Sequence, residues 1–243
     1  KYDESLQTAK RALQLNEANP WAHHTLSHVY INKGLINEGI HVLEHYAPLW
    51  NHFSHLIESH NLWHLALLYL ENLNFEKIQQ VYQRANWLHQ SQCVSEQVDA
   101  TALLWRLEME GQQSSLQWQK LAEAIGDHAN FGATPFISSQ LCYALKKGTR
   151  ENVLQEALQH IENFAQDQIK EDRFVWKEVG LPLIYGSLAF ADKDYSKVLE
   201  YFDPIISKVG CAGGSDAQID LFYETYLKSL IGVHRYREAE SLL

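Results

Sequence analysis

The chain has 243 residues, 46% of them hydrophobic, and a formal net charge of −10. This hydrophobic content is enough to bury a sizeable core, and the acidic balance, with no Lys/Arg stripe, argues against nucleic acid or an anionic membrane surface as the partner. No apolar run approaches the ~20 residues that span a bilayer. Only 12 Gly and 5 Pro are present, which is sparse for a strand-and-turn architecture, so we expect an all-α fold.

The helices expected along the chain follow the tetratricopeptide pattern, in which an antiparallel helix pair recurs about every 34 residues. Ser5, Ala9 and Ala12 match the second helix of a pair, and the step from Ser5 to Gly39 is one full period. The bulky and small positions of complete pairs are matched in residues 23–30 with 39–43, 62–69 with 78–82, 182–189 with 198–202 and, more weakly, 223–239. Each pair can bury its apolar face only against its neighbours, which favours an α-solenoid.

The signals between these segments agree with helices. Asn19 before Pro20 is typical of a helix N-terminus, and Ser215 with Gln218 has the spacing of a capping box. In the less regular middle of the chain, the helices are expected at 98–110, 116–125, 136–146 and 152–165. We expect about twelve helices, no strand, and a single tetratricopeptide-like superhelical domain over residues 1–243. The chain opens and stops in mid-pattern, so we expect it to be a segment of a longer protein.

Several blocks resemble one particular family. They are residues 60–67 (HNLWHLAL), 104–111 (LWRLEMEG), 179–183 (VGLPL), 213–218 (GGSDAQ), and 23–25 (HHT) with 28–29 (HV). In this content and order the chain resembles the tetratricopeptide repeat protein 38 family, from about Trp21 to about Leu230. The resemblance implies a helical repeat fold. It implies no reaction and no catalytic residues, so no site is carried over from it.

Histidines are the main anomaly of the composition. Nine of the 13 fall between residues 23 and 64, and two pairs, His24/His28 and His60/His64, have the i,i+4 spacing that places both rings on one helix face. In tetratricopeptide arrays the first helix of each pair lines the concave groove. By that resemblance His24, His28, His60 and Trp63 face the groove, while His64 points sideways to a neighbouring helix.

Three interpretations of this cluster remain open at this stage. His24, His28 and His60 could bind zinc or iron, with Glu58 or a water completing the shell. They could instead line a pocket for an acidic or polar ligand, or simply pack between helices, which is what most such histidines do. The H-E-x-x-H signature of metalloproteases is absent, because neither pair has a Glu beside its first His.

A second candidate group is Trp105, Arg106 and Glu108. In the same register Trp105 and Glu108 face the groove, and Arg106 either clamps a carboxylate or phosphate or, more commonly, bridges helices to an acidic side chain. The glycine-rich residues 210–215 lack the Lys-Ser/Thr ending of a P-loop and are expected to connect helices. The tryptophans are expected mostly to fill the space between helices; they are Trp21, Trp50, Trp63, Trp87, Trp105, Trp118 and Trp176.

The sequence favours a non-enzymatic binding module that presents a concave groove to a peptide or protein partner, since helical repeats build such surfaces. The alternative is a small-ligand or metal-binding protein, an enzyme included, that uses the histidine cluster. Cys93, Cys142 and Cys211 are odd in number and widely spaced. They do not suggest a disulfide framework, so we expect reduced thiols and a cytoplasmic protein.

Overall fold

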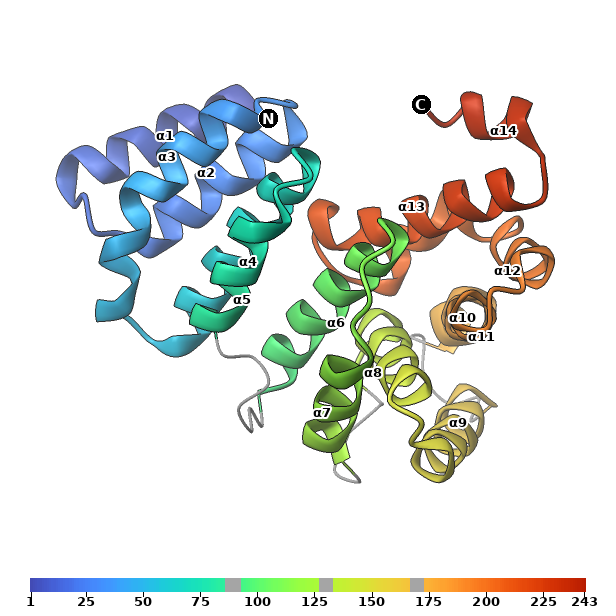
Figure 1. Cartoon of the computed structure of the whole chain (residues 1–243). Helices are drawn as coiled ribbons and strands as arrows, with labels where there is room; N and C mark the ends of the chain where they lie inside the picture. The colour runs from blue at the N-terminus through green and yellow to red at the C-terminus, as the bar shows by residue number, and fades with distance from the viewer. Residues whose placement is uncertain (86–92, 127–132, 167–172) are drawn as a thin grey trace. The chain divides into compact units, whose positions relative to one another are not determined.

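The computed structural model describes residues 1–85, 93–126, 133–166 and 173–243. These residues contain fourteen α-helices and no strand (Figure 1). The expectation of an all-α protein is thus confirmed, with two more helices than the twelve expected. No helix in these ranges is long and apolar enough to cross a membrane.

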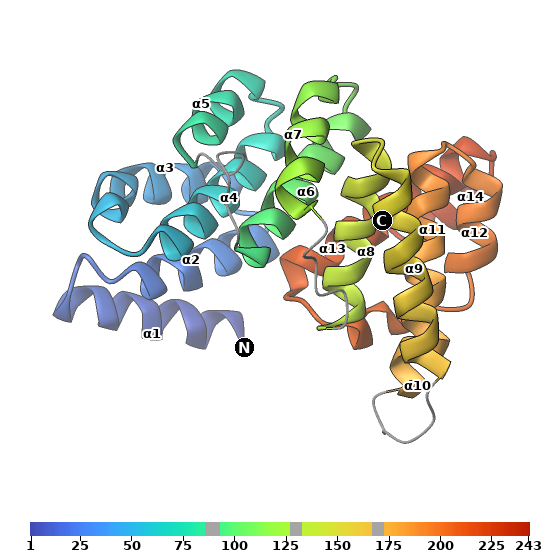
Figure 2. The ribbon, with the colours of Figure 1, turned by 90° about the horizontal axis from the view of Figure 1, so that it is seen from below.

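The contacts group into two compact units, Lys1–Leu103 and Leu104–Leu243, which are described separately. The first unit contains α1 (Tyr2–Leu15), α2 (Pro20–Asn32), α3 (Ile36–Tyr46), α4 (His55–Glu71) and α5 (Phe75–Ala85), with a 3-10 segment at Ala47–His52. It also contains the first part of α6 (Val94–Met109). Each of α1 to α5 packs against its neighbour in sequence or against the next helix but one (Figures 1 and 2).

The second unit begins with the end of α6 and continues with further helices that again pack mainly on their sequence neighbours. They are α7 (Ser115–Ile125), α8 (Pro135–Lys147), α9 (Glu151–Gln166), α10 (Arg173–Val175), α11 (Leu181–Ala191), α12 (Tyr195–Phe202), α13 (Asp216–Gly232) and α14 (Tyr236–Glu240). A π-helical turn at Trp176–Gly180 leads into α11, and a 3-10 segment at Ile206–Ala212 precedes α13. The division into two units leaves the expected single domain a prediction.

The predicted helix starts have the expected chemistry. The Asn19 side chain accepts hydrogen bonds from the backbone N–H groups of Trp21 and Ala22 at the start of α2. Ser215 and Gln218 form the predicted capping box at the start of α13. These side chains satisfy backbone donors that a helix N-terminus leaves without an intrahelical partner.

The predicted small-residue positions lie at close helix crossings. A Cβ on Gly39 would come within 2.8 Å of the Cβ of Tyr30, and one on Gly186 within 2.3 Å of the Phe202 ring. Ala66, in the equivalent position of α4, is fully buried. The tetratricopeptide template therefore places the contact points of these pairs correctly.

Replacing Ala66 with leucine should cost about 1–3 kcal/mol of stability, because three extra carbon atoms have no free space at this position. The free energy of unfolding in urea measures the effect. Gln79→Leu, which adds apolar bulk at an exposed position of α5, is the matched control and should change stability by less than about 0.5 kcal/mol. Equal stability of the Ala66→Leu variant and the wild type would contradict the assigned position.

Candidate functional site: a buried histidine cluster

Four imidazoles from α2 and α4 meet inside the first unit. The ring centroid of His28 lies 4.6 Å from that of His24 and 4.5 Å from that of His64. The ring of His60 lies 4.9 Å from both His24 and His64. The i,i+4 spacing on each helix and the packing of α2 against α4 together produce this cluster, so the predicted histidines do converge.

One nitrogen from each of His24, His60 and His64 lies within 4.8 Å of the other two. Zinc bound tetrahedrally at 2.0–2.1 Å would place such nitrogens roughly 3.4 Å apart, so small side-chain rotations would bring the three rings into coordinating positions. The convergent set thus differs from the predicted one. His64, expected to point sideways, belongs to it. His28 instead places its Nε2 3.0 Å from the Nε2 of His24.

His64 is the unusual member of the cluster. It is fully buried, and neither ring nitrogen has a hydrogen-bond partner in the part of the chain that the structure describes. A buried polar group without a partner costs about 1–3 kcal/mol, and such groups are rare enough in folded proteins to call for an explanation.

His23 shows what an ordinary buried histidine looks like in the same unit. It is also fully buried, but its Nδ1 accepts a hydrogen bond from the Trp50 indole at 3.1 Å, and its Nε2 donates to the Glu17 carbonyl oxygen at 2.9 Å. Packing between helices therefore explains His23 completely. It does not explain His64, whose nitrogens face other imidazoles.

Asp99 on α6 supplies a carboxylate behind the cluster. It is almost fully buried, and its Oδ2 accepts a hydrogen bond from the Nδ1 of His60 at 2.8 Å. This bond fixes the tautomer of His60 and leaves Nε2 unprotonated toward the other rings. A carboxylate that holds a histidine in this way is the usual outer partner of a metal-ligating imidazole.

The electrostatics keep most of the cluster neutral. Burial, reinforced by repulsion from His60 and His28, lowers the pKa of His24 to about 3. Burial and the three neighbouring rings lower the pKa of His64 well below 6.5. For His60, burial would also lower the pKa, but the charge of Asp99 and its hydrogen bond outweigh this effect, so the net pKa is raised. Neutral imidazoles are the form that binds metals.

The remaining predicted residue of this group, Trp63, is fully buried and stacks on His60 with ring centroids 5.5 Å apart. It closes one side of the cluster and offers no surface to a groove ligand. Glu58, suggested as a further ligand, is instead paired with Arg84 at 2.9 Å. On α6 a second buried carboxylate, Glu96, lies 2.7 Å from the Nδ1 of His55.

The second predicted group lies in the second unit and is engaged in packing. Trp105 is fully buried and stacked on Tyr143. The Arg106 guanidinium donates to the Glu224 carboxylate at 2.9 Å and to the Ala217 carbonyl oxygen at 3.0 Å, so it does bridge helices to an acidic side chain. Glu108 accepts a hydrogen bond from the Trp118 indole at 2.7 Å and pairs with Lys147.

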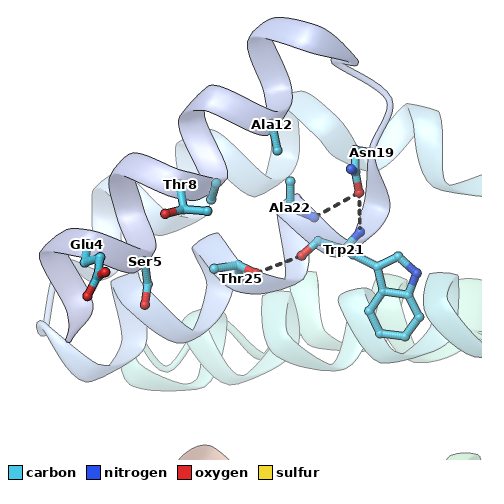
Figure 3. A pocket seen from close by; sticks show the side chains of 9 residues that line it. Glu4, Ser5, Thr8, Ala12, Asn19, Trp21, Ala22 and Thr25 are labelled. Carbon is cyan, nitrogen blue, oxygen red and sulfur yellow. Dashed lines mark hydrogen bonds between the residues drawn. The ribbon is translucent and has the colours of Figure 1, made fainter.

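The tryptophans divide sharply by exposure. In the described residues Trp50, Trp63, Trp105, Trp118 and Trp176 are at most 4% exposed, whereas Trp21 is 62% exposed; Trp87 lies outside them. Trp21 stands at the rim of a shallow pocket of about 430 Å³ between α1 and α2, lined by small side chains such as Ser5, Thr8 and Thr25 (Figure 3). Its ring also meets that of His24 edge-on, with centroids 6.0 Å apart.

Sequence reasoning found three of the four clustered histidines but missed the inward orientation of His64 and the part played by Asp99. A signal for Asp99 exists: it is the one carboxylate in the otherwise uncharged stretch 97–105. No family model matches the chain, and no solved structure is significantly similar to it. The function is therefore argued from the geometry of the histidine cluster.

Proposed function

We propose that this protein binds a divalent transition-metal ion, zinc in the first place, through His24, His60 and His64. The observation that carries the proposal is the pair of unpartnered nitrogens on the fully buried His64, which face two other imidazoles. A metal would turn this energetic cost into coordination bonds. Three imidazoles without a carboxylate suit zinc better than the two-histidine, one-carboxylate set typical of non-haem iron.

The scaffold in this proposal is a tetratricopeptide-like α-solenoid, related to the tetratricopeptide repeat protein 38 family. Its support is the one-period step from Ser5 to Gly39 and the packing of consecutive helices on one another. We place the protein in the cytoplasm, because Cys93, Cys142 and Cys211 are free, as is usual in a reducing compartment.

The direct test is metal analysis of the purified chain after zinc loading and exhaustive dialysis. We expect about one zinc per chain in the wild type and none in the double variant His24→Gln/His60→Gln, which keeps polarity and approximate size. Circular dichroism should show that this variant remains helical. Asp99→Asn should still bind zinc, but about 10- to 100-fold more weakly, since the outer carboxylate supports the ligand without touching the metal.

Two results would count against the proposal. One is a wild type that retains no zinc, cobalt or copper after dialysis. The other is a double variant that retains the metal as firmly as the wild type, which would place the ion elsewhere.

A second candidate function is the binding of a peptide or protein partner on the α2 face. The specific observation in its favour is the exposure of Trp21, because exposed aromatic side chains often anchor partners. A partner that binds the wild type and is lost with Trp21→Ala, while zinc content stays unchanged, would support this role independently of the metal.

A further inference from the structure

The proposed metal centre has fewer protein ligands than a closed structural site. Among the described residues the convergent donors are three, His24, His60 and His64. Structural zinc sites have four protein ligands, whereas sites that bind water or an outside ligand have three. His28 does not join the convergent set, since its Nε2 is hydrogen-bonded to His24.

The cluster is also reachable from one side. His24, His28 and His60 are partly exposed, and 21% of the His60 side chain is accessible. His64 and Trp63, both fully buried, close the opposite side. A ligand from solution therefore has access along the edges of the α2 histidines and His60.

Charge balance indicates the sign and size of that ligand. A divalent ion with three neutral imidazoles carries its full charge of about two into a buried site, and the Asp99 carboxylate compensates for about one of these charges through His60. The other buried carboxylate, Glu96, is hydrogen-bonded to His55. No lysine or arginine is among the charged neighbours of the three described donor histidines. One positive charge is left, which a monoanion neutralises and a phosphate dianion would overcompensate.

Trp21 indicates what the rest of the ligand would contact. Its indole is exposed and meets the His24 ring edge-on at 6.0 Å. Figure 3 shows the indole extending away from α2, clear of the Asn19 and Thr25 side chains. An organic group attached to an anion bound beside His24 would find this ring next to it, and aromatic side chains contribute strongly to such contacts.

We infer that the metal centre keeps one coordination position open for an organic monocarboxylate whose apolar body packs against Trp21. This inference rests on the proposed metal-binding function. The carboxylate could belong to a free small acid or to the C-terminus of a peptide, because both present the same anion.

The test uses the full chain loaded with Co(II), whose visible spectrum responds to a change of ligand or coordination number. Acetate, benzoate, N-acetylphenylalanine and phosphate are titrated separately. We expect saturable spectral changes with the carboxylates, about tenfold tighter binding of benzoate than of acetate, and no tighter binding of phosphate than of acetate. A preference for N-acetylphenylalanine over benzoate would identify a peptide end as the source of the carboxylate, and the reverse order a free acid.

Trp21→Ala should remove the preference for benzoate while the affinity for acetate stays unchanged. Stoichiometric Co(II) with a spectrum that no carboxylate alters would overturn the inference and leave the metal site standing. A response that appears only in His28→Gln would overturn it as well, because His28 would then be the fourth ligand. Failure to bind Co(II) at all would instead overturn the proposed function itself.

Discussion

His64→Leu is expected to make the metal-free protein more stable and to abolish its metal binding. Leucine fills most of the space of the imidazole and removes two buried nitrogens that have no hydrogen-bond partner among the described residues. Replacing an unsatisfied buried polar group with an apolar one recovers its desolvation cost, about 1–3 kcal/mol. At the same time the centre loses its most buried donor.

The opposite signs of these two effects separate a functional histidine from a packing one. A histidine retained for packing would lose stability on replacement, since its contacts with His24, His28 and His60 would be disturbed. A histidine retained for binding a metal leaves the apo-protein better off without it. The unfolding free energy in urea with EDTA and the zinc content after dialysis measure the two effects.

His41→Leu, which replaces an exposed histidine of α3 outside the cluster, is the matched control and should leave zinc binding unchanged. A destabilised His64→Leu variant that still binds one zinc per chain would contradict both parts of the prediction. Double variants with Asp99→Asn would then show whether His60 and Asp99 hold the ion without His64.

The contrast between what the sequence did and did not reveal follows from helix physics. Small residues at a fixed period mark crossings, so Gly39 and Gly186 could be placed in advance. N-terminal caps are local, so Asn19 and Ser215 could be placed as well. Both kinds of signal depend on residues close together in sequence or on a repeated template.

The rotation of α4 about its axis was not readable in the same way. Residues 61 to 69 are all buried, so α4 has no polar stripe in this stretch to mark which face meets which neighbour. Trp63 and His64 are adjacent, and a turn of about 100° exchanges their directions. The template placed Trp63 in the groove, whereas packing turns His64 toward the α2 histidines.

The same reason applies to α6, where residues 96 to 106 are all buried. Trp105 could not be assigned to a groove or to the core from its spacing. Asp99 pairs with His60 across 39 positions of sequence, and no local pattern predicts a contact at that separation. The candidate residues could thus be found by composition, but their roles required the packing of α2, α4 and α6.

Acidification is expected to destabilise the metal-free protein progressively from about pH 6.5 toward pH 3. The His24 side chain has a pKa of about 3 in the folded protein, against 6.5 as its ordinary value. Between these two pH values the unfolded chain binds the proton and the folded protein does not, so the stability rises with pH. The contribution of His24 is fully present above pH 6.5 and is lost as the pH falls toward 3.

The size of this effect is large for a single side chain. Each tenfold change in proton affinity is worth about 1.4 kcal/mol, so His24 alone accounts for a loss of up to about 5 kcal/mol. His64, whose pKa is lowered in the same direction by burial and by its neighbours, adds to the loss, although close rings titrate together and their contributions do not simply sum. The raised pKa of His60 opposes the trend.

Urea unfolding followed by circular dichroism, in EDTA at a series of pH values from 7.5 to about 4, measures the slope directly. The variant His24→Gln isolates one ring: its stability should depend less steeply on pH than that of the wild type, with the two curves converging or crossing at low pH. Zinc-loaded wild type should stay stable to lower pH and then lose metal and structure together, because protons and the metal compete for the same nitrogens. Parallel curves for the wild type and His24→Gln would mean that His24 takes up its proton near the ordinary value and that the cluster is open to water.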